Sequence, residues 1–302
     1  MRIMRFSHRL LTLLAAAILI GMAAPRAYAQ TSITAPLPDL NGRSVVVVTA
    51  QDYVPLTFVD AKTNVPSGME YELWRELCVR LDCKVTFKAA AWDGMIIAVN
   101  QKQYDVGMDG ISITDERKKQ VDFSDAYLNI TEKFLVNSAE KTFTDKKSFA
   151  ANPKLRIGVQ AGTTGYYLAL DLLGLKDGDK SDRLVLYNDF GLSVQALLTG
   201  DIDAVISDTA AGAGYVGANA GKLKLLDETL NTDSLGFMFP QGSDLVKPVN
   251  AALAAMKADG YLNYLQNKWF FLYNPGPDAA GAPQVATAAA TMSATMAATA
   301  SK

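Results

Sequence analysis

The chain has 302 residues, with 29 basic residues, 31 acidic residues and a single histidine. The first 29 residues, which we expect to be removed, carry four arginines, that histidine (His8) and no acid, so the mature chain holds 25 basic and 31 acidic residues and a net charge of −6. An acidic chain argues against nucleic-acid binding, and loss of the histidine excludes histidine-dependent catalysis and histidine metal ligands.

The N-terminus has the pattern of a secretory signal peptide. Positively charged residues precede an apolar run over residues 10–24, and a small-x-small site follows at residues 27–29. The run is shorter than the ~20 apolar residues of a membrane span, so we expect cleavage after Ala29. No cysteine follows that site, which argues against a lipid anchor. Residues 30–42 are polar and contain proline, and we expect them to be a leader.

From Arg43 the pattern alternates between strand and helix. The β-branched run at residues 45–48 predicts a buried strand. Leucines at helical spacing predict a helix over residues 73–81, and a second strand follows at residues 85–87. A short helix near Asp93, which can cap it, and a third strand over residues 104–108 come next. This alternation predicts an α/β domain with a largely parallel sheet.

A second unit of the same kind begins near Leu155. Residues 155–159, 184–187 and 203–207 are predicted strands, and residues 162–165 open a helix. Asp189 is expected to cap another helix, which Gly200 ends. Near residues 237–239 the pattern returns to that of the first unit, and two helices finish it, the last over residues 261–270. About 230 residues are enough for two lobes.

Two cysteines lie five positions apart, Cys78 and Cys83. In an oxidising compartment such a pair is a candidate disulfide, which would tie the end of a helix to the start of the next strand. The alternative is two buried free thiols. Two thiols without histidine do not fill a tetrahedral shell, so we expect no metal and no cofactor.

The C-terminal residues, 274–302, are rich in alanine and threonine and almost uncharged. Such a segment cannot bury enough apolar surface to offset the entropy of ordering it. We expect a disordered tail, with a marginal alanine-rich helix as the alternative.

The most informative stretch covers residues 104–124, YDVGMDGISITDERKKQVDFS. Arg117 follows a Ser-Ile-Thr run that should end a strand and open a short helix. A guanidinium there can hold a carboxylate through two parallel hydrogen bonds. The alternative is a surface arginine paired with Asp122.

Six blocks, in order, resemble the family 3 solute-binding proteins, the periplasmic amino-acid receptors of ABC importers. The blocks are residues 52–55 (DYVP), 91–94 (AWDG), 104–124, 158–164 (GVQAGTT), 201–208 (DIDAVISD), and 257–261 (KADGY) with 268–270 (KWF). The resemblance as a whole covers roughly residues 43–271.

The resemblance implies a type II periplasmic binding protein-like α/β fold, with two lobes, two hinge strands and a ligand cleft between the lobes. The first lobe would comprise residues 43–128 plus 236–273, and the second residues 129–235. It also implies a monomeric periplasmic protein that is not an enzyme. Such a protein captures an amino acid and delivers it to an ABC permease in the inner membrane.

The resemblance also assigns roles around the amino acid's α-carbon. Arg117 would bind the carboxylate together with Thr164, at a helix N-terminus. Asp208, at the carboxyl edge of a sheet, would bind the ammonium. Ser112 would help with its hydroxyl and amide, and Gly110 with its carbonyl. The alternative roles of Thr164 and Asp208 are those of ordinary helix caps.

Four further positions face the side chain of the ligand in this resemblance. Tyr53 and Trp92 would be aromatic walls, or else core residues, and Gln160 would touch the side chain. Asp109 departs from the small or hydroxyl residue usual in the family, and a carboxylate there favours a cationic or amide-bearing side chain. Ala50 stands where binders of basic amino acids often carry an aspartate. Ala50 thus argues against a basic side chain, whereas Asp109 favours one, and we expect a polar or basic amino acid.

Two alternative functions use the same fold. A cyclohexadienyl or arogenate dehydratase-like enzyme would need a general acid, which Asp109 could supply, although further anions in the cleft would repel the two carboxylates of prephenate. A sensory receptor would present its bound ligand to a membrane partner, and no residue distinguishes that role from transport.

Overall fold

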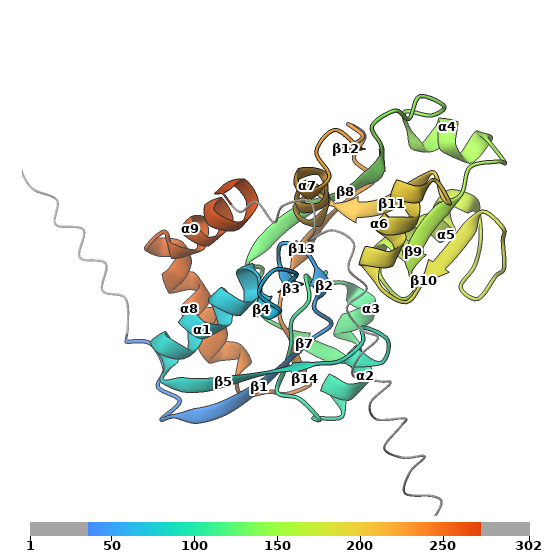
Figure 1. Ribbon diagram of the computed structural model, residues 1–302. Coiled ribbons are helices and arrows are strands. Elements are labelled where there is room, and N and C mark those ends of the chain that lie inside the picture. Colours follow the sequence, from blue (N-terminus) through green and yellow to red (C-terminus); the bar gives the residue numbers. More distant parts are fainter. Residues whose placement is uncertain (1–35, 273–302) are drawn as a thin grey trace, which may run out of the picture. The chain divides into compact units, whose positions relative to one another are not determined.

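The structure is a computed structural model that describes residues 36–272, shown in Figure 1. The predicted signal peptide and the predicted tail lie outside the described residues. None of the helices in the described part combines the length and apolar character needed to cross a membrane.

The first sheet has five strands in the order β5-β1-β6-β14-β7. Its interior strand β1 pairs in parallel with β5 and β6, whereas β14 pairs antiparallel with β6 and β7. Its strands are β1 (Arg43–Thr49), β5 (Cys83–Ala89), β6 (Val106–Gly107), β7 (Val121–Phe123) and β14 (Met238–Pro240). Val45, Val47 and Val48 are fully buried, as a β-branched run in an interior parallel strand should be.

A small antiparallel sheet and several helices accompany the first sheet. The small sheet contains β2 (Asp52–Tyr53), β3 (Thr57–Asp60) and β4 (Val65–Ser67). The helices are α1 (Met69–Leu81), α2 (Met95–Asn100), α3 (Asp115–Lys118), α8 (Val246–Ala258), α9 (Tyr261–Asn267) and the π-helical turn η1 (Lys268–Leu272). Strand β2, between β1 and β3, carries Asp52 and Tyr53, the first pocket residues along the chain.

The second sheet has six strands, in the order β10-β9-β11-β8-β12, with β13 also paired to β8. Its strands are β8 (Leu128–Asn137), β9 (Ile157–Gln160), β10 (Leu184–Tyr187), β11 (Ala204–Asp208), β12 (Leu223–Leu225) and β13 (Asn231–Leu235). Its helices are α4 (Lys146–Ala151), α5 (Thr164–Leu173), α6 (Phe190–Thr199) and α7 (Thr209–Ala218). Strands β9, β10 and β11 are parallel, so their carboxyl ends share one edge.

The chain passes between the two sheets twice, from β7 to β8 and from β13 to β14. The two passages are hydrogen-bonded to each other: Tyr127 N donates to Leu235 O at 3.1 Å, and Ser124 N donates to Phe237 O at 2.9 Å. Beyond them, β8 and β13 lie side by side (Figure 1). We call this region, residues 124–127 and 235–237, the strand crossing.

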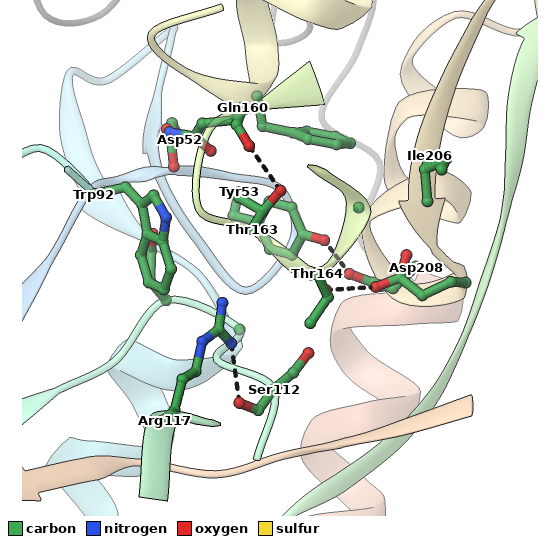
Figure 2. Close-up of a pocket in the computed structure, with 15 residues that line it drawn as sticks. Asp52, Tyr53, Trp92, Ser112, Arg117, Gln160, Thr163, Thr164, Ile206 and Asp208 are labelled. Atoms are coloured by element: carbon green, nitrogen blue, oxygen red, sulfur yellow. Dashed lines mark hydrogen bonds between the residues drawn. The ribbon is translucent and has the colours of Figure 1, made fainter. Parts of the chain in front are cut away.

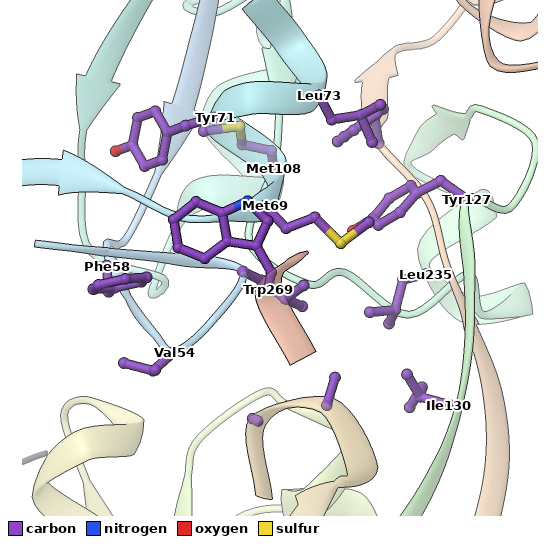
Figure 3. Packing of buried hydrophobic residues seen from close by; sticks show 14 of the residues in the cluster. Val54, Phe58, Met69, Tyr71, Leu73, Met108, Tyr127, Ile130, Leu235 and Trp269 are labelled. Atoms are coloured by element: carbon purple, nitrogen blue, oxygen red, sulfur yellow. The ribbon is translucent and has the colours of Figure 1, made fainter. Parts of the chain in front are cut away.

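Aromatic packing holds the strand crossing against the first lobe's core. The ring of Tyr127 stacks on Phe237 with centroids 4.7 Å apart, and Trp74 of α1 contacts the same ring edge-on at 5.2 Å. Figure 3 shows Tyr127 and Leu235 beside Met69 in this cluster. The crossing is therefore part of a packed core.

Local structure confirms the disulfide and corrects two details. Cys78 and Cys83 are bonded, with an S–S distance of 1.97 Å, and join the end of α1 to the start of β5. Asp93 does not cap the next helix: Gly94, with φ +80°, takes the N-cap position, and no side chain accepts a hydrogen bond there. The predicted third strand is shorter, because the turn after α2 continues past Lys102 at φ +61°.

Candidate functional site

A pocket is lined by residues of strand β2, of the second sheet, and of the loops and helix starts beside them. All nine predicted site residues line it: Tyr53, Trp92, Asp109, Gly110, Ser112, Arg117, Gln160, Thr164 and Asp208. Six further residues complete the lining: Asp52, Glu132, Thr163, Gly165, Phe190 and Ile206. Its mixed polar and apolar lining is typical of a small-molecule site.

Arg117 lies below Trp92 and beside Ser112 in Figure 2, at one side of this group. Thr114 caps α3 by accepting from Arg117 N at 3.2 Å, which fixes the backbone. Nη1 donates to Ser112 O at 2.9 Å and Nη2 donates to Gly162 O at 3.2 Å. The guanidinium carbon lies 5.0 Å from the Trp92 ring centroid, within cation–π range.

Burial makes this arginine an unusual cation. Arg117 is only 8% exposed, and desolvation lowers the pKa of its guanidinium to about 10. The side chain therefore stays charged at neutral pH. The alternative role beside Asp122 is not realised, because the Asp122 carboxylate accepts from Gly242 N at 2.7 Å. A buried guanidinium in a pocket is suited to binding a planar anion.

The N-terminus of α5 lies beside the arginine. Thr163 is its N-cap and accepts from Tyr166 N at 3.1 Å, and Thr164 and Gly165 begin the helix. The Thr164 hydroxyl donates to Glu132 Oε1 at 2.9 Å. Amide donors at a helix N-terminus favour an anion, and this helix start comes from the second lobe.

Asp208 ends β11 and caps α7. Its Oδ1 accepts from Ala210 N at 2.6 Å and from Ala211 N at 2.9 Å. Its Oδ2 accepts from the Tyr53 hydroxyl, which reaches it from β2 in the first lobe (Figure 2). The predicted capping alternative is therefore realised, and one carboxylate oxygen remains directed at the pocket side.

Acidic side chains outnumber basic ones in the pocket. Four carboxylates line it (Asp52, Asp109, Glu132 and Asp208). Arg117 is the sole basic residue among the described lining residues. Burial is the main cause that raises the pKa of all four carboxyls, to about 8 for Glu132. Repulsion from nearby acids adds to the effect for Asp52, Glu132 and Asp208. Each would hold its charge more readily beside an added cation.

Asp109 has a structural role that the sequence did not reveal. Its Oδ1 accepts from Thr57 Oγ1 at 2.6 Å, from Thr49 Oγ1 at 2.8 Å and from Ala50 N at 3.2 Å. The carboxylate thus fixes the end of β1 to β3. This bonding leaves Oδ1 little capacity for a ligand.

The Asp52 carboxylate accepts a longer side-chain hydrogen bond than the Asp109 carboxylate does. Its Oδ2 accepts one long hydrogen bond, 3.4 Å from Gln160 Nε2, which also donates to Asn188 O at 3.1 Å. Burial followed by repulsion from Asp109 and Asp189 raises the pKa of Asp52 well above its usual range.

Sequence reasoning missed Asp52, Glu132 and an apolar wall. The wall includes Phe190, whose ring lies 5.1 Å from that of Tyr53. The sequence did carry a signal for Glu132. It lies two positions from Ile130 and two from Phe134 in β8, on the same buried face of the strand. An acid on the buried face of a strand needs a partner or a function.

Comparison with known proteins places these features in a family. Residues 45–271 match the bacterial extracellular solute-binding proteins, family 3. A probable histidine-binding protein of Neisseria gonorrhoeae is 30% identical, over 76% of this chain and 84% of that protein. The L-cystine-binding protein TcyA of Bacillus subtilis is 32% identical, over 75% of this chain and 81% of that protein.

Solved structures agree with the sequence relatives. The arginine-, lysine-, histidine-binding protein ArtJ from Geobacillus stearothermophilus matches with a TM-score of 0.69 and 29% identity, covering 77% of this chain and 97% of that one. The ancestral amino acid-binding protein AncCDT-1, a precursor of cyclohexadienyl dehydratase, matches with a TM-score of 0.66 and 30% identity, covering 75% and 95%. The predicted type II two-lobed fold is confirmed.

Proposed function

Because this chain belongs to the family 3 bacterial extracellular solute-binding proteins, we propose that it captures a basic amino acid and delivers it to an ABC importer. The observation that carries the proposal is the charge of the pocket, four carboxylates around one buried arginine. A zwitterion needs one cation and one anion from the protein. The surplus of carboxylates favours a second positive charge on the ligand.

The proposed pose divides the ligand between the lobes. Arg117 and the start of α5 at Thr164 bind the α-carboxylate. Asp208, with Glu132 beside it on the paired strand, binds the α-ammonium. Ser112 and Gly110 add backbone and hydroxyl contacts near the α-carbon.

The ligand's side chain then extends between aromatic rings. Tyr53 and Trp92 flank it, and its distal cation approaches Asp52 and Gln160, with Asp109 adding a negative field. Asp52 thus takes the part that we first assigned to Asp109, since Asp109 Oδ1 already accepts three hydrogen bonds.

Delivery requires the pocket to open and close. We propose that residues 43–128 plus 236–273 and residues 129–235 move as two lobes about the strand crossing, by the hinge closure that ligand-binding proteins use. The mature protein would act as a monomer in the periplasm after cleavage at Ala29, with the permease in the inner membrane as its partner.

We propose binding without turnover. The dehydratase hypothesis needs a proton donor, and Oδ1 of the Asp109 carboxyl that we considered for it accepts hydrogen bonds from Thr49, Thr57 and Ala50. The other pocket acids would repel a dicarboxylate substrate. Incubation with prephenate should yield no phenylpyruvate absorbance, and its appearance would favour the enzyme.

The proposal is tested by thermal shift against the twenty amino acids plus ornithine and citrulline. We expect arginine, lysine, ornithine or histidine to raise the melting temperature most, and glutamate and aspartate to have no effect. The proposed function fails if no amino acid stabilises the protein.

A further inference from the structure

Glu70 is a buried acid that the pocket does not use. It is the second residue of α1, where an acid usually favours the helix dipole from a solvated position. Here the residue is 0% exposed, as are its neighbours Met69 and Tyr71. Backbone bonds fix this helix start, since Glu70 N donates to Leu56 O at 3.1 Å. The side chain therefore points into the protein.

One oxygen of Glu70 joins two distant segments. Oε1 accepts from Gly110 N at 2.9 Å and also from the Tyr127 hydroxyl. Gly110 is part of the pocket lining. It has φ +60°, and a Cβ there would lie 2.8 Å from the Tyr53 ring. The backbone that faces the ligand is thus placed partly by Glu70.

The other segment is the strand crossing. Tyr127 N donates to Leu235 O, and the Tyr127 ring stacks on Phe237. Tyr127 O also accepts from Gln266 Nε2 at 3.3 Å. A shift of the crossing therefore moves Tyr127, and Tyr127 is bonded to the same oxygen as Gly110.

Stability alone does not explain an acid at this place. The other oxygen, Oε2, is buried and has no hydrogen-bond partner among the described residues. The charged and titratable groups that face the carboxyl are Asp109, Asp208, Tyr71 and Tyr127, and none of them is a cation. An apolar residue here would leave Gly110 N and the Tyr127 hydroxyl without their acceptor, so the carboxyl serves to join these two donors.

We propose that Glu70 is a positioning residue that ties the pocket backbone at Gly110 to the strand crossing at Tyr127, so that ligand seating and lobe closure are coupled. The coupling of two segments is a property of the protein itself. Only its consequence for affinity rests on the proposed function.

Amide hydrogen exchange of the intact mature protein, without ligand, tests whether Glu70 links Gly110 to the strand crossing. Glu70→Ala should raise amide exchange at least tenfold both at residues 109–112 and at residues 124–128, whereas Glu70→Gln, which keeps an acceptor oxygen, should restore wild-type rates. Glu72→Ala is the matched control, since Glu72 lies in the same helical turn and bonds Lys268 outside this network. It should leave both segments unchanged.

A second variant decides the case if Glu70→Ala does not fold. Tyr127→Phe removes the hydrogen bond from the Tyr127 hydroxyl to Glu70. We expect faster amide exchange at Gly110, because Gly110 N is bonded to the same Glu70 oxygen. Unchanged exchange at Gly110, or a Glu70→Ala effect confined to one segment, would overturn the proposal.

Calorimetry with arginine as the probe tests the consequence. Affinity should fall at least tenfold in Glu70→Ala and stay within about threefold in Glu70→Gln. Wild-type affinity in a folded Glu70→Ala would overturn the coupling to ligand seating. Failure of the wild-type protein to bind any amino acid would refute the proposed function, and the exchange results would still decide the tie.

Discussion

Substitution of Arg117 by lysine keeps the positive charge and removes the planar guanidinium, with its two parallel hydrogen-bond donors. The guanidinium offers two nitrogens, which now donate to Ser112 O and Gly162 O, and its face lies over Trp92. A bound carboxylate would accept hydrogen bonds to a charged donor, each worth about 1.5–3 kcal/mol. Lysine can replace one such bond. The remaining loss of about 1.5–3 kcal/mol corresponds to roughly a 10- to 150-fold weaker Kd.

Isothermal calorimetry with arginine at neutral pH measures this loss. Arg183→Lys is the matched control, because Arg183 also donates to backbone carbonyls and lies 5.5 Å from an aromatic ring, that of Phe149, away from the pocket. We expect its Kd to be unchanged. A folded Arg117→Lys protein that binds within threefold of wild type would refute the assigned role.

Three further predictions concern selectivity, pH and the disulfide. Asp52→Asn should weaken arginine binding at least tenfold more than glutamine binding, whereas Glu132→Gln should weaken both alike; calorimetry with both ligands would show the contrary pattern if the assignment is wrong. Burial raises the pKa of Glu70 and Glu132 to about 8 from 4.5, so their protonated forms favour the fold below pH 4.5, and this stability is lost as pH rises to about 8. Urea unfolding should therefore show a smaller fall in stability over this window for Glu70→Gln or Glu132→Gln than for wild type, and parallel curves would contradict the pKa direction. Replacing Cys78 and Cys83, five positions apart, by serine should lower the free energy of unfolding by about 2 kcal/mol with no change in Kd, and a changed Kd would contradict their placement away from the pocket.

Patterns with a local cause were predictable from the sequence. The valine run of β1, the Asp189 cap of α6 and the Cys78–Cys83 bond each depend on neighbours in the chain. The resemblance supplied the nine site residues, because its motifs lie where strands end and loops line the pocket. Their roles toward a ligand stay predictions.

Contacts between distant segments were not predictable. Asp109 looked like a ligand group because nothing in the chain revealed that Thr49 and Thr57 would meet its carboxylate. Glu70 drew no prediction from the sequence, since its partners lie 40 and 57 positions away. Register, which places Glu132 opposite Asp208, appears only when the strands pair.

The most direct test of a basic-amino-acid site compares arginine with citrulline, which has nearly the same shape without the side-chain charge. Calorimetry on the wild-type mature protein should give stoichiometric binding of arginine, with citrulline at least tenfold weaker because the pocket's surplus carboxylates lack a cation to bind. Equal affinities would contradict selection by charge, and no heat with arginine or any other basic amino acid would contradict the account as a whole.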